Sequence, residues 1–289
     1  MGLQDRLKAA AGTNVAATET KTDQTTTLAN QRGVNAQEPA AGDGGSAMSN
    51  AREAMRTTSV AYGGRKNDFP VGTGIFLLKD GTFSIKSDGK YKISEFVFVC
   101  LKPTSPGPSG IPFGGQGYDG AVPGQEYAVS IFQDYSPKYV KGTMTKNLAA
   151  LQSCMGWTAD ITKKYQDTDE GFAKLEELMQ GLVGCTLNGT PTNVPCMFAN
   201  QVVLKMSSKV SIVKQVDKET KQPMMVAKTD GSGGYEQVTK SYLNTYWNEK
   251  ILLEPLLEQV DEAVVADAFG GEDAVMAAME NEKFIAEFV

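Results

Sequence analysis

The segment that decides the fold is Lys90–Leu101, and its sequence, KYKISEFVFVCL, alternates along its whole length. Successive side chains of a β-strand point to opposite faces, so every second residue shares a face. One face runs from Tyr91 to Leu101 and is apolar apart from Glu95. This period of two predicts a strand with one face in the core.

The opposite face of this strand combines Lys90, Lys92, Phe96 and Phe98. A strand face exposed to water seldom carries two phenylalanines, because a large apolar ring is more favourable when it is buried. Two interpretations are open. Either a helix or loop covers the two rings, or the rings form a stacking platform beside positive charge.

Strand patterns flank this segment on both sides. Upstream, Phe69–Lys79 and Thr82–Ser87 are predicted strands, joined by a hairpin turn at Asp80-Gly81. Downstream, residues 102–124 form a loop rich in proline and glycine, and Gln125–Phe132 is a further strand. Loops of this length in a compact domain are usually functional or disordered.

The pattern then changes to helical spacing and back. We expect helices over Thr145–Met155 and Asp167–Val183, strands over Val194–Met206, Lys209–Val216 and Pro223–Lys228, and helices over Tyr242–Val265 and Glu272–Val289. This order predicts a β-dominated α+β chain. Its core is an OB-fold-like barrel with a helical insertion between strands 3 and 4, followed by C-terminal helices. A β-sandwich with a helical insert is the alternative, since periodicity does not separate the two.

Composition and charge divide the chain into three parts. Residues 1–59 are mostly small and polar and are predicted to be a disordered leader. Residues 60–250 form the core domain, and residues 251–289 form an acidic, helical tail. The leader holds six basic and six acidic residues, the core 21 and 18, and the tail one and ten. The tail either keeps the protein solvated, competes with an anionic ligand for the basic core, or recruits partner proteins.

Missing residue types exclude several kinds of catalytic site. The chain has no histidine, which removes Ser-His-Asp and Cys-His nucleophile systems. Its four cysteines lack C-x-x-C spacing, and no Walker A motif is present, so we expect no metal and no cofactor. Scattered carboxylates leave a hydrolase as a minor alternative, and we expect that the protein is not an enzyme. The sequence shows no signal peptide and no run long enough to span a bilayer, so we expect a cytoplasmic location.

Four short motifs carry a resemblance to a known family. They are Phe69-Pro70-Val71-Gly72-Thr73-Gly74, Lys90-Tyr91-Lys92-Ile93 running into Glu95-Phe96-Val97-Phe98, Pro123-Gly124-Gln125-Glu126-Tyr127, and the helix Thr145–Trp157. On these motifs, Phe69 to Val213 resembles bacteriophage-encoded single-stranded DNA-binding proteins with an OB-fold. The resemblance implies sequence-independent coating of single strands during phage DNA replication, recombination or repair, in the cytoplasm of an infected bacterial host.

The tail is also similar to those of bacterial single-strand binding proteins, which recruit replication enzymes. It departs from them because it has a helical pattern and lacks a dense aspartate run and a terminal Pro-Phe. The similarity implies replication or recombination proteins as partners through the tail, beside single-stranded DNA itself, and the departures count against it. A structural protein of the virus particle, from its tail or head decoration, is the alternative function.

Single-strand binding needs cations along the phosphates and aromatic faces for the bases. The candidate residues are Lys86, Lys90, Lys92, Phe96, Phe98, Phe132, Tyr135, Lys138, Tyr139, Lys141 and Lys146. Lys205, Lys209 and Lys214 are candidates for the other side of a basic groove, although edge lysines often only deter aggregation.

Overall fold

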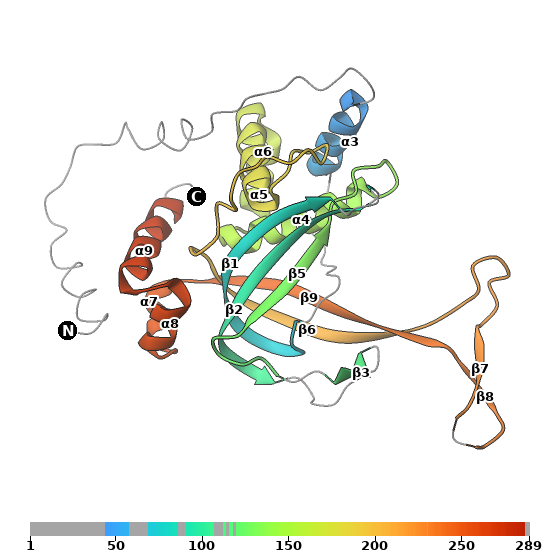
Figure 1. Cartoon of the computed structure of the whole chain (residues 1–289). Helices are drawn as coiled ribbons and strands as arrows, with labels where there is room; N and C mark the ends of the chain where they lie inside the picture. Colours follow the sequence, from blue (N-terminus) through green and yellow to red (C-terminus); the bar gives the residue numbers. More distant parts are fainter. Residues whose placement is uncertain are drawn as a thin grey trace, which may run out of the picture.

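The structure is a computed structural model that describes residues 44–57, 69–85, 89, 91–106, 112–113, 116–117, 120–229 and 231–286. It is a mixed α+β fold in which helices lie on both faces of an antiparallel sheet (Figure 1). A long two-stranded arm projects from one end of this sheet (Figure 1).

The sheet has five strands in the order β5-β2-β1-β6-β9. These are β1 (Gly72–Ile85), β2 (Lys92–Pro106), β5 (Glu126–Phe132), β6 (Val203–Lys214) and β9 (Thr239–Ile251). Two small ribbons pair β3 (Pro112–Phe113) with β4 (Gln116–Gly117) and β7 (Met225–Ala227) with β8 (Tyr235–Gln237). The described helices are α3 (Gly44–Thr57), α4 (Val140–Met155), α5 (Ala159–Asp167), α6 (Asp169–Val183), α7 (Leu253–Leu257), α8 (Glu262–Phe269) and α9 (Glu272–Ala286).

The predicted hairpin turn at Asp80-Gly81 is wrong, because β1 continues through it. Asp80 lies opposite Val97 and Gly81 opposite Phe96, and a β-bulge falls between Leu78 and Asp80. A Cβ atom on Gly81 would lie 2.9 Å from the Cβ of Cys196, so glycine is required here by close packing. The Asp-Gly pair therefore marks a bulge, which bends the strand.

The helix predicted from Tyr242 is also wrong over its first ten residues, which form β9. Leu243 and Trp247 are four residues apart, a spacing that fits one face of a helix as well as one face of a strand. In the structure both are buried, with Thr245 between them, and Tyr242 and Tyr246 lie on the other face. Pairing with β6 along its whole length decides in favour of the strand.

The sheet is strongly curled. β2 and β9 are separated by two strands, which in a flat sheet would place them about 14 Å apart, at about 4.8 Å per strand. Yet the Trp247 ring lies edge-on to Phe96 and Phe98, with centroid distances of 5.0 and 5.1 Å. Among the described residues β5 and β9 do not pair, so no closed barrel forms and the predicted barrel is not confirmed. The helical insertion between the third and fourth sheet strands is confirmed as α4–α6.

Helix α3 occupies part of the predicted leader, so the prediction of disorder is wrong for residues 44–57. Ala51 and Met55 are fully buried in the same core cluster as the apolar residues of α4–α6, and α3 packs against α4 and α5. The Arg52 Nε donates to Glu176 Oε1 at 2.6 Å, and Gln166 Nε2 donates to the Met55 carbonyl at 2.6 Å. A narrow stripe of small apolar residues gave too weak a sequence signal for this helix. Residues 1–43 lie outside the described residues.

The acidic C-terminal segment is a packed layer rather than an extended tail. Leu253, Leu256, Val265 and Phe269 are buried in a second core on the sheet face opposite α4–α6. The sheet supplies Ile75, Leu77, Val99, Leu101 and Val203 to this core. β2 is thus buried on both faces along part of its length, with Phe96 and Phe98 toward α4–α6 and Val99 and Leu101 toward α7–α9.

Two lysine side chains of the sheet donate hydrogen bonds to backbone carbonyls of the C-terminal layer. The Lys79 Nζ donates to the Ala268 carbonyl at 2.8 Å, in the last turn of α8, and Lys102 Nζ donates to the Gln259 carbonyl at 2.8 Å. Positive charge at a helix C-terminus is favourable, because the last carbonyls there carry partial negative charge.

A buried ion pair joins β9 to α9. The Lys250 Nζ lies 3.9 Å from Glu282 Oε1, and Glu282 Oε2 accepts from the Leu253 backbone N–H at 3.0 Å. Burial lowers the pKa of Lys250 and raises the pKa of Glu282. The opposite charge of the partner counteracts both shifts, and the hydrogen bond from Leu253 further stabilises the Glu282 carboxylate.

We predict that Trp247→Ala destabilises the protein by about 3–5 kcal/mol, because it removes the ring that packs against both phenylalanines. Urea unfolding followed by circular dichroism measures the loss. Tyr242→Ala is the matched control on the outward face of the same strand, and it should lower the free energy of unfolding far less. Equal losses for the two variants would contradict the assigned strand and its inward face.

We predict that Lys250→Met destabilises the protein by about 3 kcal/mol, because Glu282 is left as a buried charge. The double variant Lys250→Met/Glu282→Leu should be more stable than this single variant. Because the pKa of Glu282 is raised, protonation should occur in the folded Lys250→Met protein before it occurs in the unfolded chain. Its stability deficit should therefore shrink as the pH falls through that raised pKa. A deficit independent of pH, measured by urea unfolding, would refute the role of charge.

Candidate nucleic-acid interface

The aromatic residues predicted to stack on bases are mostly inside the protein. Phe96 and Phe98 are 0% exposed, so the interpretation of β2 as a stacking platform is wrong and the covered alternative holds. Tyr135 is buried as well, and its hydroxyl donates to Gln133 Oε1 at 2.9 Å. Burial raises the pKa of Tyr135 well above its ordinary value. None of these three rings presents a face to an outside ligand.

The lysines predicted beside them are dispersed. Lys92 is half-buried, and its Nζ donates to the Asn188 carbonyl at 3.3 Å on the α4–α6 side. Lys86 and Lys90 lie outside the described residues. Phe132 is half-buried at the end of β5 and makes an edge-on contact with the exposed Tyr91, at a centroid distance of 6.2 Å. Tyr91 was placed on the core face by the sequence pattern and is 52% exposed.

The segment around the start of α4 keeps more of its predicted character. Lys138, Tyr139 and Lys141 are exposed, and Lys138 Nζ lies 4.9 Å from the centroid of the Tyr139 ring. Lys146 lies one turn further along α4 and is half-buried. These residues form a small cationic-aromatic patch rather than a platform.

A more regular arrangement of lysine and tyrosine lies on β6 and β9. Residues opposite each other in an antiparallel pair share a face, and Met206 lies opposite Trp247 on the core face. The other face carries Lys209, Ser211, Lys240, Tyr242, Asn244 and Tyr246, which we call the ribbon face. Asn244 Nδ2 donates to Ser211 Oγ at 2.7 Å across the two strands. Ser153 Oγ on α4 donates to the Trp247 carbonyl at 2.7 Å and anchors the ribbon from the core side.

Two lysines lie over two tyrosine rings on this face. Lys209 Nζ is 5.5 Å from the Tyr246 centroid, and Lys240 Nζ is 5.4 Å from the Tyr242 centroid. Both distances are within the range at which a ring face attracts a cation, about 6 Å. The lysines are exposed and the tyrosines half-buried, so both charge and ring surface face solvent. By contrast, Lys205 on the same face is paired with Glu249 at 3.1 Å.

Sequence reasoning singled out Lys209 but missed Lys240, Tyr242 and Tyr246. The reason is that a helix predicted from Tyr242 leaves out Lys240 and does not place Tyr242 and Tyr246 beside Lys209 of a neighbouring strand. A period-two reading of residues 239–251 aligns Lys240, Tyr242 and Tyr246 on one face and would have found them.

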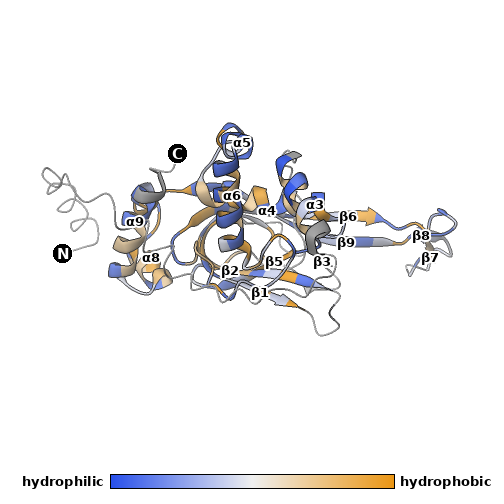
Figure 2. Cartoon of the chain, turned by 90° about the horizontal axis from the view of Figure 1, so that it is seen from above, coloured by the Kyte–Doolittle hydropathy of each residue, from blue (hydrophilic) through white to orange (hydrophobic). Residues whose placement is uncertain are grey.

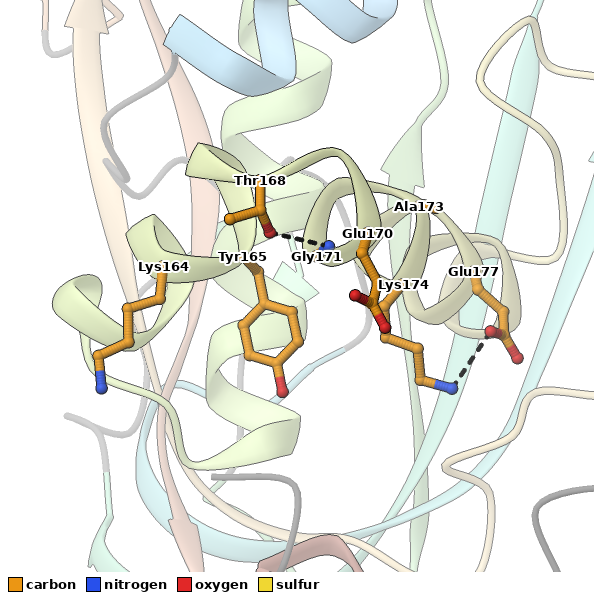
Figure 3. A pocket seen from close by; sticks show the side chains of 8 residues that line it. All are labelled: Lys164, Tyr165, Thr168, Glu170, Gly171, Ala173, Lys174 and Glu177. Carbon is orange, nitrogen blue, oxygen red and sulfur yellow. Dashed lines mark hydrogen bonds and ion pairs between the residues drawn. The ribbon is translucent and has the colours of Figure 1, made fainter.

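A hollow of about 620 Å³ lies between α5 and α6 (Figure 3). Its lining combines Lys164, Lys174, Glu170 and Glu177, and Lys174 Nζ is paired with Glu177 Oε2 at 3.2 Å. Thr168 Oγ1 accepts from the Gly171 N–H at 3.1 Å and caps α6. With both signs of charge, this lining has no preference for a phosphate or any other single charge.

Other chemistry finds little support in the described part of the chain. No cluster of acidic or cysteine side chains there has the grouping needed to hold a metal ion. The four cysteines are buried and form no disulfide bonds. Burial raises the pKa of Cys100 to about 12 and those of Cys185 and Cys196 to about 11. A thiol must ionise to act as a nucleophile, so these cysteines act as core residues. Among the described helices, none combines the length and the hydropathy of a membrane span.

Comparisons with known proteins found no matching family model, no matching curated protein and no matching solved structure.

We predict that the native protein does not react with Ellman's reagent at mildly alkaline pH, because all four thiols are buried and their pKa values are raised. In denaturant all four should react. Rapid reaction of one thiol in the native protein would contradict its assigned burial.

Proposed function

We propose that this protein binds single-stranded DNA without sequence preference, as in phage replication or recombination. The observation that carries the proposal is the ribbon face, where two lysine–tyrosine pairs repeat along one open surface. Cations beside aromatic rings are the elements that single strands require, since phosphates need charge and every base has a face that stacks.

The strand order supports the same proposal. Counted along the chain, the five sheet strands lie in the order third, second, first, fourth, fifth, with helices between the third and fourth. This is the strand order of an OB-fold opened between its third and fifth strands, and we propose an OB-like half-barrel. Oligonucleotides bind OB-folds across strands 2 and 3 and beside the loops that follow strands 1 and 4.

Two aromatic groups support this proposal, because each lies beside a loop that corresponds to one of these two loops. Tyr91 and Phe132 lie at the ends of the second and third strands. Tyr242 and Tyr246 lie on the fifth strand, at the base of the arm that joins the fourth strand to the fifth.

We predict that a fluorescent poly-dT oligomer binds the protein at low salt and is released as salt rises, because phosphate contacts displace counterions. Tyr242→Ala and Tyr246→Ala should each weaken binding by about 1–3 kcal/mol, the usual contribution of one stacked base. Fluorescence anisotropy measures both effects.

Tyr242→Phe is the matched control, since it keeps the ring and should bind like the wild type. Lys163→Ala, an exposed lysine on α5, controls for the loss of one positive charge. The proposal fails if the oligomer shows no anisotropy change at low salt. If the oligomer binds but both tyrosine-to-alanine variants bind normally, the ribbon face is the wrong site.

A second candidate function is a structural protein of a virus particle. The observation that favours it is the projecting arm, which exposes apolar residues suited to assembly contacts. Co-purification of the chain with intact particles, together with no binding to poly-dT, would favour this function over DNA binding.

A further inference from the structure

The arm beyond the sheet exposes an unusual amount of apolar surface. β1 pairs with β6 only as far as Ser208, so no further strand of the five-stranded sheet pairs with the arm from Lys209 to Asn244. The arm consists of the ends of β6 and β9, the β7–β8 ribbon and the turns between them. Its exposed apolar residues are Ile212, Val213, Val216, Met224, Met225, Val226 and Tyr235. Tyr235 is 70% exposed and Ile212 66%. In Figure 2, hydrophobic segments continue along β6 onto the arm.

This surface calls for a macromolecular partner. A two-stranded ribbon is at best marginally stable in water on its own, and contiguous exposed apolar patches mark interaction sites. The arm also carries six lysines against four acidic residues. Because the arm carries more lysines than acidic residues, two arms repel each other and an acidic partner surface is favoured.

An acidic surface that fits the arm exists on the same chain. Residues 251–289 hold ten acidic residues and one lysine. Glu254, Glu258, Asp261, Asp267 and Glu280 are exposed there, and Leu252 beside them is 54% exposed. This surface therefore offers carboxylates to the arm lysines and an apolar contact to the arm side chains.

The two surfaces lie at opposite ends of the molecule. Figures 1 and 2 both place α8 and α9 at one end and β7 and β8 at the other, so an arm does not reach its own C-terminal layer. Complementary surfaces at opposite ends make head-to-tail contacts, which extend from copy to copy.

We propose that the arm of one copy of this protein docks on the acidic C-terminal layer of a second copy, so that the chain self-associates head to tail. The contact uses the α7–α9 surface and the whole arm, whose base carries Lys209 and Lys240 of the ribbon face. Because it forms between copies of the chain without nucleic acid, its test is independent of the proposed DNA binding.

The test uses the full chain, freed of nucleic acid, in sedimentation velocity over a wide concentration range. The arm variant is Met225→Asp/Tyr235→Asp, and the tail variant is Glu258→Lys/Asp267→Lys. All four side chains are exposed, so circular dichroism and thermal unfolding should match the wild type. The matched control is Asp160→Lys/Glu170→Lys, which makes the same charge change on α5 and α6, outside the C-terminal layer.

We expect the wild type and the control to grow in mass with concentration and to dissociate at high salt, because screening weakens contacts between exposed charges. Each of the two interface variants should stay monomeric. A mixture of both should form a one-to-one dimer and nothing larger, since the intact arm of the tail variant can dock on the intact layer of the arm variant.

Three results would overturn the proposal. The wild type stays monomeric at all concentrations, the mixture forms no dimer, or the tail variant associates like the wild type. The last result would indicate arm-to-arm contacts instead.

Discussion

The packing of Trp247 against Phe96 and Phe98 is the contact on which the rest of the structure depends. It joins strands that two others separate, so it exists only if the sheet curls. The bulge beside Asp80 supplies the bend in β1, and close packing at Gly81 keeps it. The curl in turn gives α4 an apolar surface to cover, and Ser153 on α4 holds the Trp247 backbone in place.

The same contact positions the candidate site. Since Trp247 points into the core, strand alternation directs Tyr246 and Tyr242 to the opposite face. Their partners Lys209 and Lys240 follow from the register of β6 against β9. The phenylalanines that first suggested a stacking platform are thus the residues that orient the tyrosines, and they do so from inside the protein.

The C-terminal layer changes the meaning of the charge distribution. A free acidic tail would act mainly through long-range screening, but this segment buries Leu253, Val265 and Phe269 against the sheet. Two sheet lysines, Lys79 and Lys102, are engaged by its backbone carbonyls. Its exposed carboxylates therefore form a fixed surface at one end of the molecule, opposite the lysine-bearing arm.

The sequence by itself determined the α+β class, the strand that begins at Lys92 and the helical insertion, because these signals are local. It also excluded histidine chemistry outright. Only the tertiary structure decided which faces of β2 are covered. Both faces carry apolar residues, so the alternation could not show that helices bury the two faces along part of the strand. The tertiary structure also decided that β1 continues through Asp80-Gly81, beside a bulge between Leu78 and Asp80, and that residues 239–251 are a strand. A turn signal and a four-residue spacing each fit two local structures. Only pairing with strands distant in sequence selects one of them, and the ribbon face exists because of that selection.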